Sequence, residues 1–325
     1  MTRFSVGRPL REAMHDRWHD CSGHAGKDAI RAFYRTTVAI VWFGITAPQA
    51  CVWANTWTDR QALIREFWYD GAEINRYELN QNCYGEQHRG HCELIFVTEP
   101  FDLQQQVKDE RGNEASIDVL KLNALRRFHT GLYSYRSMVS TFQPVDMEHY
   151  PHPLKSSASI QDWCGQTFQQ MNRQAQGWLL RMFSYFQRMG DRELQLANAY
   201  LEDALWLQIR LNPEKLPRGE FAIIPGAFHC RMAHLQPQAL PAVARLHKGT
   251  KTWTYSLVYQ NHDRELSVDF DAEFPHVIRA WQTRSQQGTT SAVLRKRWMH
   301  CNYWEHNQPQ DRSLRRKLDL DPDCN

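Results

Sequence analysis

The amino-acid sequence predicts an α+β fold, in which a mainly antiparallel sheet carries packed helices and a central αα-hairpin. Two kinds of pattern predict this class. In some segments apolar and polar residues alternate with period two, as in half-buried strands, and in others apolar residues recur with helical spacing. The 325 residues are 42% hydrophobic and 12% aromatic, so the chain can bury a sizeable core and is not expected to be disordered.

The strongest strand signal is a β-hairpin between residues 252 and 270. Its first half places four large apolar residues on one face of an extended segment: Trp253, Tyr255, Leu257 and Tyr259. Residues 261–264 have the short polar side chains typical of a turn. Alternation then resumes at Leu266, Val268 and Phe270, which predicts the second strand.

The residues before this hairpin predict more strands of the same sheet. Residues 221–224 and 227–235 are strand-like runs, and Pro225 separates them because proline cannot donate to a strand ladder. On the second run His229 and Cys230 would face opposite sides, so they could not hold one ion together.

The N-terminal half predicts strands and helices in alternation. Residues 36–55 are uncharged, but Pro48 interrupts them, and two buried strands are predicted there in place of a membrane span. Apolar residues with helical spacing predict a helix from Thr58 or Asp59 to Tyr69.

A second group of elements is predicted after that helix. A polar loop at residues 80–90 precedes a strand at 93–97, and residues 116–128 are predicted as another helix.

The central αα-hairpin is predicted between residues 159 and 213. Residues 159–162 resemble a capping box, with Asp162 in place of Glu, and Gly190 and Asp191 would end one helix and begin the next. Apolar residues would form a stripe along each helix: Trp163, Met171, Trp178, Met182 and Phe186 along the first, and Leu194, Ala197, Leu201, Leu205 and Leu211 along the second.

Residues 145–158 are the best candidate for a linker, because they lack periodicity and prolines lie in or beside them, at positions 144, 151 and 153. The predicted organisation is an N-terminal α+β domain at 1–144, this linker, and a domain at 159–325 with the helical hairpin, the sheet and a basic C-terminal region. One large domain is the alternative, since the chain length permits either.

Cysteine usage and the N-terminal residues predict a cytoplasmic protein with no membrane association. The 8 cysteines do not form a regular disulfide framework. The first twenty residues are polar and do not resemble a secretory signal.

Two clusters of histidine and cysteine are candidate metal sites, with zinc as the candidate ion. The second cluster lies in the predicted loop at 80–90 and just after it, where Gly85 and Gly90 would let the chain wrap an ion. The first cluster is His15, His19, Cys21 and His24, and the second is Cys83, His88, His91 and Cys92. Neither has the paired CxxC spacing that marks a strong zinc motif.

The C-terminal region has the one clear charge asymmetry of the chain. Between residues 274 and 318 there are nine Arg or Lys and two Asp or Glu, which gives +7 and leaves −4 for the rest of a chain whose net charge is +3. Cations can neutralise phosphates and aromatic rings can stack on bases, so this region is a candidate nucleic-acid surface. Its candidate residues are Arg295, Lys296, Arg297, Trp298, Arg312, Arg315, Arg316 and Lys317.

These observations favour a non-catalytic protein that binds DNA or RNA, or a subunit of a nucleic-acid–protein complex. One alternative is a metal-dependent hydrolase or nuclease, in which the histidine and cysteine clusters act with nearby carboxylates, namely Asp16, Asp20, Glu86 or Glu93. Another alternative is a protein-interaction scaffold that uses its aromatic surfaces.

Overall fold

The computed structural model describes residues 57–320, and all of them belong to one compact unit. The predicted strands at 36–55 and the first histidine–cysteine cluster lie outside these residues. Within them, no helix combines the length and apolar content that crossing a membrane requires.

The described residues are mostly strands, with a few short helices. The helical elements are α1 (Trp57–Tyr69), η1 (Glu202–Ala204), α2 (Leu205–Leu211), η2 (Pro213–Lys215), α3 (Ala227–Met232) and η3 (Pro309–Leu318). The strands of the first half are β1 (Ala72–Cys83), β2 (Glu86–Asp102), β3 (Val107–Lys108), β4 (Ser116–Thr130), β5 (Tyr133–Pro144), β6 (Lys155–Asp162), β7 (Gly165–Gln174), β8 (Gly177–Ser184) and β9 (Arg192–Leu196). Those of the second half are β10 (Tyr200–Leu201), β11 (Gly219–Ile224), β12 (Leu240–Lys248), β13 (Thr252–Tyr259), β14 (Glu265–Asp271), β15 (Ile278–Ser285) and β16 (Gly288–Cys301).

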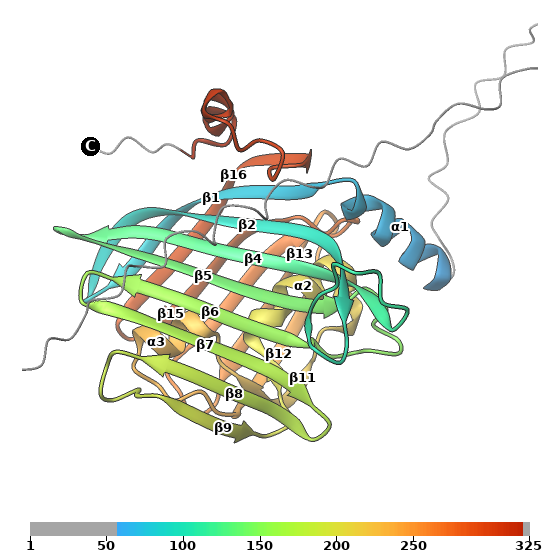
Figure 1. The fold of residues 1–325 in the computed structure, drawn as a ribbon. Helices are drawn as coiled ribbons and strands as arrows, with labels where there is room; N and C mark the ends of the chain where they lie inside the picture. The colour runs from blue at the N-terminus through green and yellow to red at the C-terminus, as the bar shows by residue number, and fades with distance from the viewer. Residues whose placement is uncertain (1–56, 321–325) are drawn as a thin grey trace, which may run out of the picture. The chain divides into compact units, whose positions relative to one another are not determined.

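All sixteen strands form one sheet that curls into a barrel-like shell (Figure 1). Its order is β10 to β16, then β1, β2 and β4 to β9, with β3 paired to β2, so the pairing of β1 with β16 joins the two halves of the chain. Every pair is antiparallel except β10 with β11. The predicted α+β class is therefore wrong, because the fold is a large antiparallel, barrel-like sheet.

Side chains close the shell where its two edge strands meet. Met171 and Leu180, from β7 and β8, pack in one cluster with Leu201 and Ile224, from β10 and β11. The indole Nε1 of Trp178 donates to the carbonyl oxygen of Ala199 at 3.0 Å. Closure of the shell thus rests on side-chain packing and a side-chain hydrogen bond, in addition to the backbone ladders between strands.

Helices α2 and α3 lie inside the shell, between the wall of β4 to β6 and the wall of β11 to β15 (Figure 1). Every residue of α2 is buried. Its Leu207 and Ile209 belong to the main core together with Leu122 of one wall and Leu257 of the other. We call α2 and α3 the plug, because they fill the space between the two walls.

The predicted αα-hairpin is wrong, because residues 155–196 form strands β6 to β9. Trp178 and Met182 are four residues apart, and this spacing puts both on one face of a strand as well as of a helix. Leu180, which lies between them in the sequence, is also buried, and burial of every second residue is the pattern of a strand. The predicted helix at 116–128 is also wrong, since these residues are part of β4.

Other expectations had mixed outcomes. The helix ending at Tyr69, the strand at 221–224 and the hairpin at 252–270 are confirmed as α1, β11 and β13–β14. Residues 227–235, predicted as a strand, contain α3 in place of it. The predicted loop at 80–90 is the β1–β2 hairpin. Of the predicted linker 145–158, residues 145–154 connect β5 to β6 and residues 155–158 belong to β6, which pairs directly with β5.

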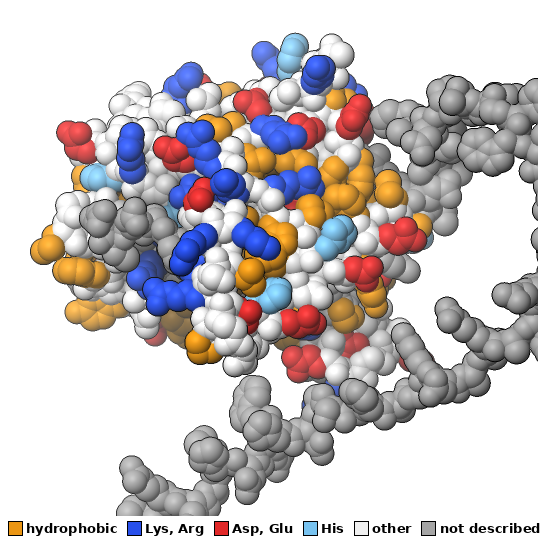
Figure 2. Space-filling view, turned by 90° about the horizontal axis from the view of Figure 1, so that it is seen from above, with side chains coloured by type: hydrophobic (Ala, Val, Ile, Leu, Met, Phe, Trp, Pro, Cys, Tyr) orange, Lys and Arg blue, Asp and Glu red, His pale blue; other side chains and the backbone are white. Residues whose placement is uncertain are grey.

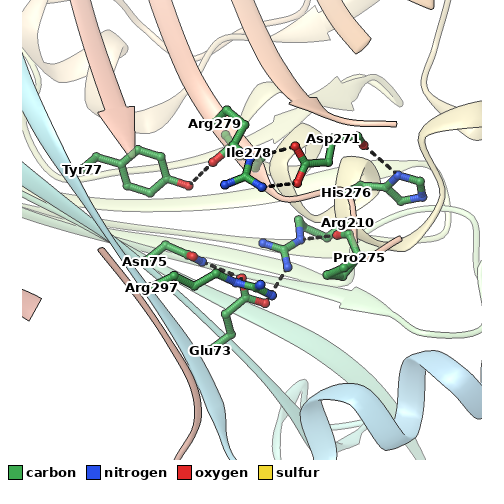
Figure 3. Close-up of polar contacts among 10 residues, drawn as sticks. All are labelled: Glu73, Asn75, Tyr77, Arg210, Asp271, Pro275, His276, Ile278, Arg279 and Arg297. Atoms are coloured by element: carbon green, nitrogen blue, oxygen red, sulfur yellow. Dashed lines mark hydrogen bonds and ion pairs between the residues drawn. The ribbon is translucent and has the colours of Figure 1, made fainter. Parts of the chain in front are cut away.

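A fully buried ion pair joins the plug to the sheet (Figure 3). Arg210 of α2 donates from Nη2 to Glu73 Oε2 at 2.5 Å and from Nε to the carbonyl oxygen of Pro275 at 2.7 Å. Glu73 also accepts from Trp68, Asn75 and Arg297, each at 2.9 Å. Burial by itself would raise the pKa of Glu73, but the guanidinium of Arg210, helped by that of Arg297, lowers this pKa to about 2.

Removing one partner of this pair should destabilise the protein far more than removing an exposed pair. We expect Glu73→Gln or Arg210→Met to cost about 3–5 kcal/mol in denaturant unfolding, because either change leaves a buried charge uncompensated. Because the folded-state pKa lies below its usual 4.5, the wild-type contribution is present above about pH 4.5 and lost as pH falls towards 2, and Glu73→Gln should lack this acid dependence.

The matched control is Arg181→Met, which breaks the exposed ion pair with Glu193. Its expected cost is below about 1 kcal/mol. If breaking the buried pair and breaking the exposed pair lowered the free energy of unfolding equally, the role assigned to Glu73 would be wrong.

Candidate functional site

The main cavity lies at the end of the barrel opposite α1 and has a volume of about 670 Å³. The turns between β1 and β2, β6 and β7, and β15 and β16 surround it, and α3 and η1 contribute to its wall. This volume falls within the range of about 300–1,000 Å³ that is usual for small-molecule sites.

Arg126 of β4 lines the cavity from inside the barrel. Its guanidinium lies over the rings of Phe228 and Trp281, 4.4 and 4.5 Å from their centroids. Among residues 57–320 it has neither a carboxylate within ion-pair distance nor a hydrogen-bond partner. Burial lowers the pKa of Arg126, but a guanidinium stays protonated in proteins. The cavity therefore presents a positive charge held by two aromatic rings.

A second cavity-lining arginine, Arg264, is neutralised by Glu202 of η1. Arg264 donates to both carboxylate oxygens of Glu202, at 2.5 and 3.2 Å, and the Tyr259 hydroxyl donates to Oε2 at 2.6 Å. Burial would raise the pKa of Glu202, but Arg264 lowers it to about 2. Glu202 is therefore ionised at neutral pH.

The pKa of Asp203, the residue after Glu202, is shifted in the opposite direction. Burial, with the neighbouring Glu202 charge, raises the pKa of Asp203 to about 7, and its Oδ2 accepts from the amide of Ala227 at 3.0 Å. Gly226 permits this contact, because a Cβ there would lie 2.9 Å from Asp203 Oδ1 and from Glu202 Oε1. Two adjacent carboxylates thus differ in protonation near neutral pH.

Two further pairs of side chains join the elements around the cavity. His229 of α3 and His262 of the β13–β14 turn have their Nε2 atoms 2.8 Å apart, so they can share one proton. Burial, and then the nearby Arg264, lowers the pKa of His229 to about 3. Arg231 of α3 forms a buried ion pair with Asp162 at 3.2 Å.

Three tyrosines meet beside the cavity mouth. The Tyr84 hydroxyl lies 2.9 Å from that of Tyr133 and 2.7 Å from that of Tyr135. The ring of Tyr135 stacks on Phe128 with centroids 4.7 Å apart. These contacts join the β1–β2 turn to the β4–β5 turn.

The structure does not bring the second histidine–cysteine cluster together. Cys92 points into the main core, whereas Nε2 of His91, its neighbour on β2, lies 3.3 Å from Glu93 Oε1. Burial lowers the pKa of His91 to about 4, so its ring is neutral near pH 7. His88 Nε2 lies 3.2 Å from the carbonyl oxygen of Cys83. Within the described residues no three His, Cys, Asp or Glu side chains are placed to hold a metal ion.

The predicted nucleic-acid residues lie on β16 and η3, on the upper side of the barrel in Figure 1. The side chain of Arg297 lies on the inner face of the sheet, as does that of its cross-strand partner Asn75, which is fully buried. Arg295 and Arg297 are bonded to Glu78 and Glu73 of β1, and Lys317 lies over the ring of Trp298, 4.8 Å from its centroid. Figure 2 views the molecule from this side and shows Lys and Arg interspersed with Asp, Glu and apolar side chains. Nucleic-acid binding by this surface stays a prediction.

Arg126, Glu202 and Asp203 were missed because their segments were assigned to helices. On a strand, Leu122, Ala124, Arg126 and Phe128 share one face, and a cation among apolar residues was the signal available there. Nothing in the sequence pairs His229 with His262, because the two residues belong to separate elements.

Replacing Asp203 by Asn should remove a pH dependence of stability. A folded-state pKa near 7, above the usual 3.8, means that wild-type stability falls as pH rises from about 4 to 7. Asn keeps an acceptor for the Ala227 amide but cannot ionise. Over this range we expect the free energy of unfolding of the variant to rise relative to that of wild type by up to about 4 kcal/mol. Denaturant unfolding at pH 4.5, 6 and 8 measures this difference.

The exposed Glu265 provides the control, since Glu265→Gln should leave the pH profile of unfolding unchanged. Parallel profiles for Asp203→Asn and wild type would show that Asp203 ionises normally in the folded protein.

No family model matches the chain, and no curated protein matches it. Among solved structures, the chain is similar to a β-barrel-like protein from Brucella abortus that represents the domain of unknown function DUF1849, with a TM-score of 0.45 and 7% identity over 70% of this chain and 98% of that one.

Proposed function

We propose that the protein binds a small anionic, amphipathic molecule inside its barrel, with the anionic group on Arg126. The observation that carries this proposal is the guanidinium of Arg126, which faces the cavity between two aromatic rings and has no acidic partner among residues 57–320. An arginine presents a planar set of donors that matches carboxylate, sulfonate and phosphate groups.

The charges of the cavity support an anionic ligand. Four arginines line it, Arg126, Arg231, Arg264 and Arg284, against three acids, Asp162, Glu202 and Asp203. Two of the acids are already bonded to Arg231 and Arg264. The third, Asp203, has a pKa of about 7 and so carries a full negative charge only above neutral pH.

The apolar lining supports a ligand with a hydrophobic part. Trp206, Phe228 and Leu266 line the cavity near Arg126 and Arg264. The ring of Trp206 also packs edge to face on Trp281, with centroids 5.7 Å apart. A hydrophobic wall with a few convergent polar groups is the usual composition of a small-molecule site.

A matched pair of fluorescent probes tests the proposal. 8-Anilinonaphthalene-1-sulfonate and N-phenyl-1-naphthylamine share their rings, and only the first carries a sulfonate. We expect Arg126→Gln to weaken sulfonate binding about tenfold or more, because hydrogen bonds to charged groups contribute about 1.5–3 kcal/mol. Binding of the uncharged probe should change much less. Wild type should also bind the sulfonate more weakly at pH 8 than at pH 6, as Asp203 ionises.

Arg181→Gln is the control, because Arg181 does not line the cavity and forms an exposed ion pair with Glu193 on the neighbouring strand. Its sulfonate affinity should stay within about twofold of wild type, since exposed charges are screened by solvent. Equal losses for both probes in Arg126→Gln, or none for either, would refute the role of Arg126.

A further inference from the structure

The turns at the cavity end carry large apolar side chains in solvent. The β1–β2, β4–β5 and β6–β7 turns and the loop after β8 each present one, and all four turns lie at the end of the barrel opposite α1 (Figure 1). These mouth residues and their exposed fractions are Tyr84 at 73%, Leu132 at 82%, Trp163 at 67% and Tyr185 at 78%. Solvent exposure of this size is unfavourable for each of them unless a partner covers it.

An apolar row adjoins the mouth residues on the outer face of the sheet. Phe168 of β7 and Phe183 of β8 are direct cross-strand partners, and both point outward with about half of their surface exposed. Met138 of β5 extends the row through Ser159, which pairs with both Met138 and Phe168. The apolar surface thus continues from the mouth along one side of the barrel.

Charged side chains are scarce on these turns. Residues 130–133 of the β4–β5 turn contain none, whereas the exposed Glu86 follows the β1–β2 turn and the loop after β8 carries the exposed Arg188 and Asp191. The one acid in residues 162–165, Asp162, is buried in its ion pair with Arg231. A surface on which large apolar side chains predominate and the few charges nearly balance fits the interface of a lipid bilayer, where tryptophan and tyrosine are favoured and neutral headgroups need no charge complement.

We infer that the mouth residues dock the barrel on a lipid bilayer, with the cavity opening towards the lipid. This inference rests on the proposed function, because an amphipathic ligand could then move between bilayer and Arg126 without crossing water. The apolar contacts come from separate turns around an opening, so they can enter the headgroup region together while the sheet itself stays outside. Such docking depends on apolar surface and not on anionic lipid.

Flotation with phosphatidylcholine vesicles tests the docking. We expect wild type to float with the vesicles and the double variant Trp163→Ser/Tyr185→Ser to lose at least tenfold in partition coefficient. Binding should be the same at 0.1 and 0.5 M NaCl, because screening acts on charges and not on apolar contacts. Docking through the basic residues of β16 and η3 would instead require anionic lipid and weaken with salt.

The matched control is Tyr69→Ser/Val107→Ser, which removes two exposed apolar side chains from the opposite end of the barrel. This variant should float like wild type. Cys164, a free and exposed cysteine next to Trp163, gives a second readout. An NBD fluorophore there, in a chain whose Cys21, Cys51 and Cys324 are serine, should shift to the blue when vesicles are added.

Three outcomes would overturn the inference: no flotation of wild type, equal flotation of the mouth and control variants, or an unshifted NBD spectrum. The sulfonate and its uncharged analogue, titrated without vesicles, separate the two proposals. If Arg126 still discriminates the probes while flotation fails, the docking inference falls and the ligand proposal stands. A rim that binds another protein would give that same result.

Discussion

The buried ion pair between Glu73 and Arg210 is the interaction on which the rest of the structure depends. Glu73 lies on β1 at the seam with β16, and Arg210 lies on the plug helix α2. Their bonds to Trp68, Arg297 and the carbonyl oxygen of Pro275 tie α1, β16 and the segment before β15 to the same point. A charge without these partners would be very costly at zero exposure, so only one position of the plug satisfies all of them.

The position of the plug decides where the barrel is filled and where it is hollow. Every residue of α2 is buried and its apolar side chains belong to the main core, whereas α3 and η1 contribute to the wall of the cavity at the other end. Most charges inside are matched in the same way as Glu73, by a guanidinium bonded to a carboxylate: Arg264 with Glu202 and Arg231 with Asp162. Arg126 differs because aromatic rings hold it in place of an acid, which leaves its donors directed at the cavity.

The sequence patterns were informative where their period was unambiguous. The hairpin at 252–270 alternates over both strands, so its buried face follows directly. In residues 159–186 the large apolar residues stand mostly at even spacings, which satisfy a helix of period 3.6 approximately and a strand of period two fully. The polar residues Thr167 and Gln169, which face the barrel interior, weakened the strand signal further.

By itself, the sequence determined local properties: the helix before β1, the aromatic hairpin, several strands and the excess of cations near the C-terminus. Tertiary structure alone decided which residues meet. Arg126, Asp203 and His229 are separated by tens of residues, and their distances, burial and protonation follow from how the sheet curls around α2 and α3. The same holds for the second histidine–cysteine cluster, whose members are near in sequence. On adjacent positions of a strand, His91 and Cys92 must face opposite sides, and the pleat of the sheet overrides proximity along the chain.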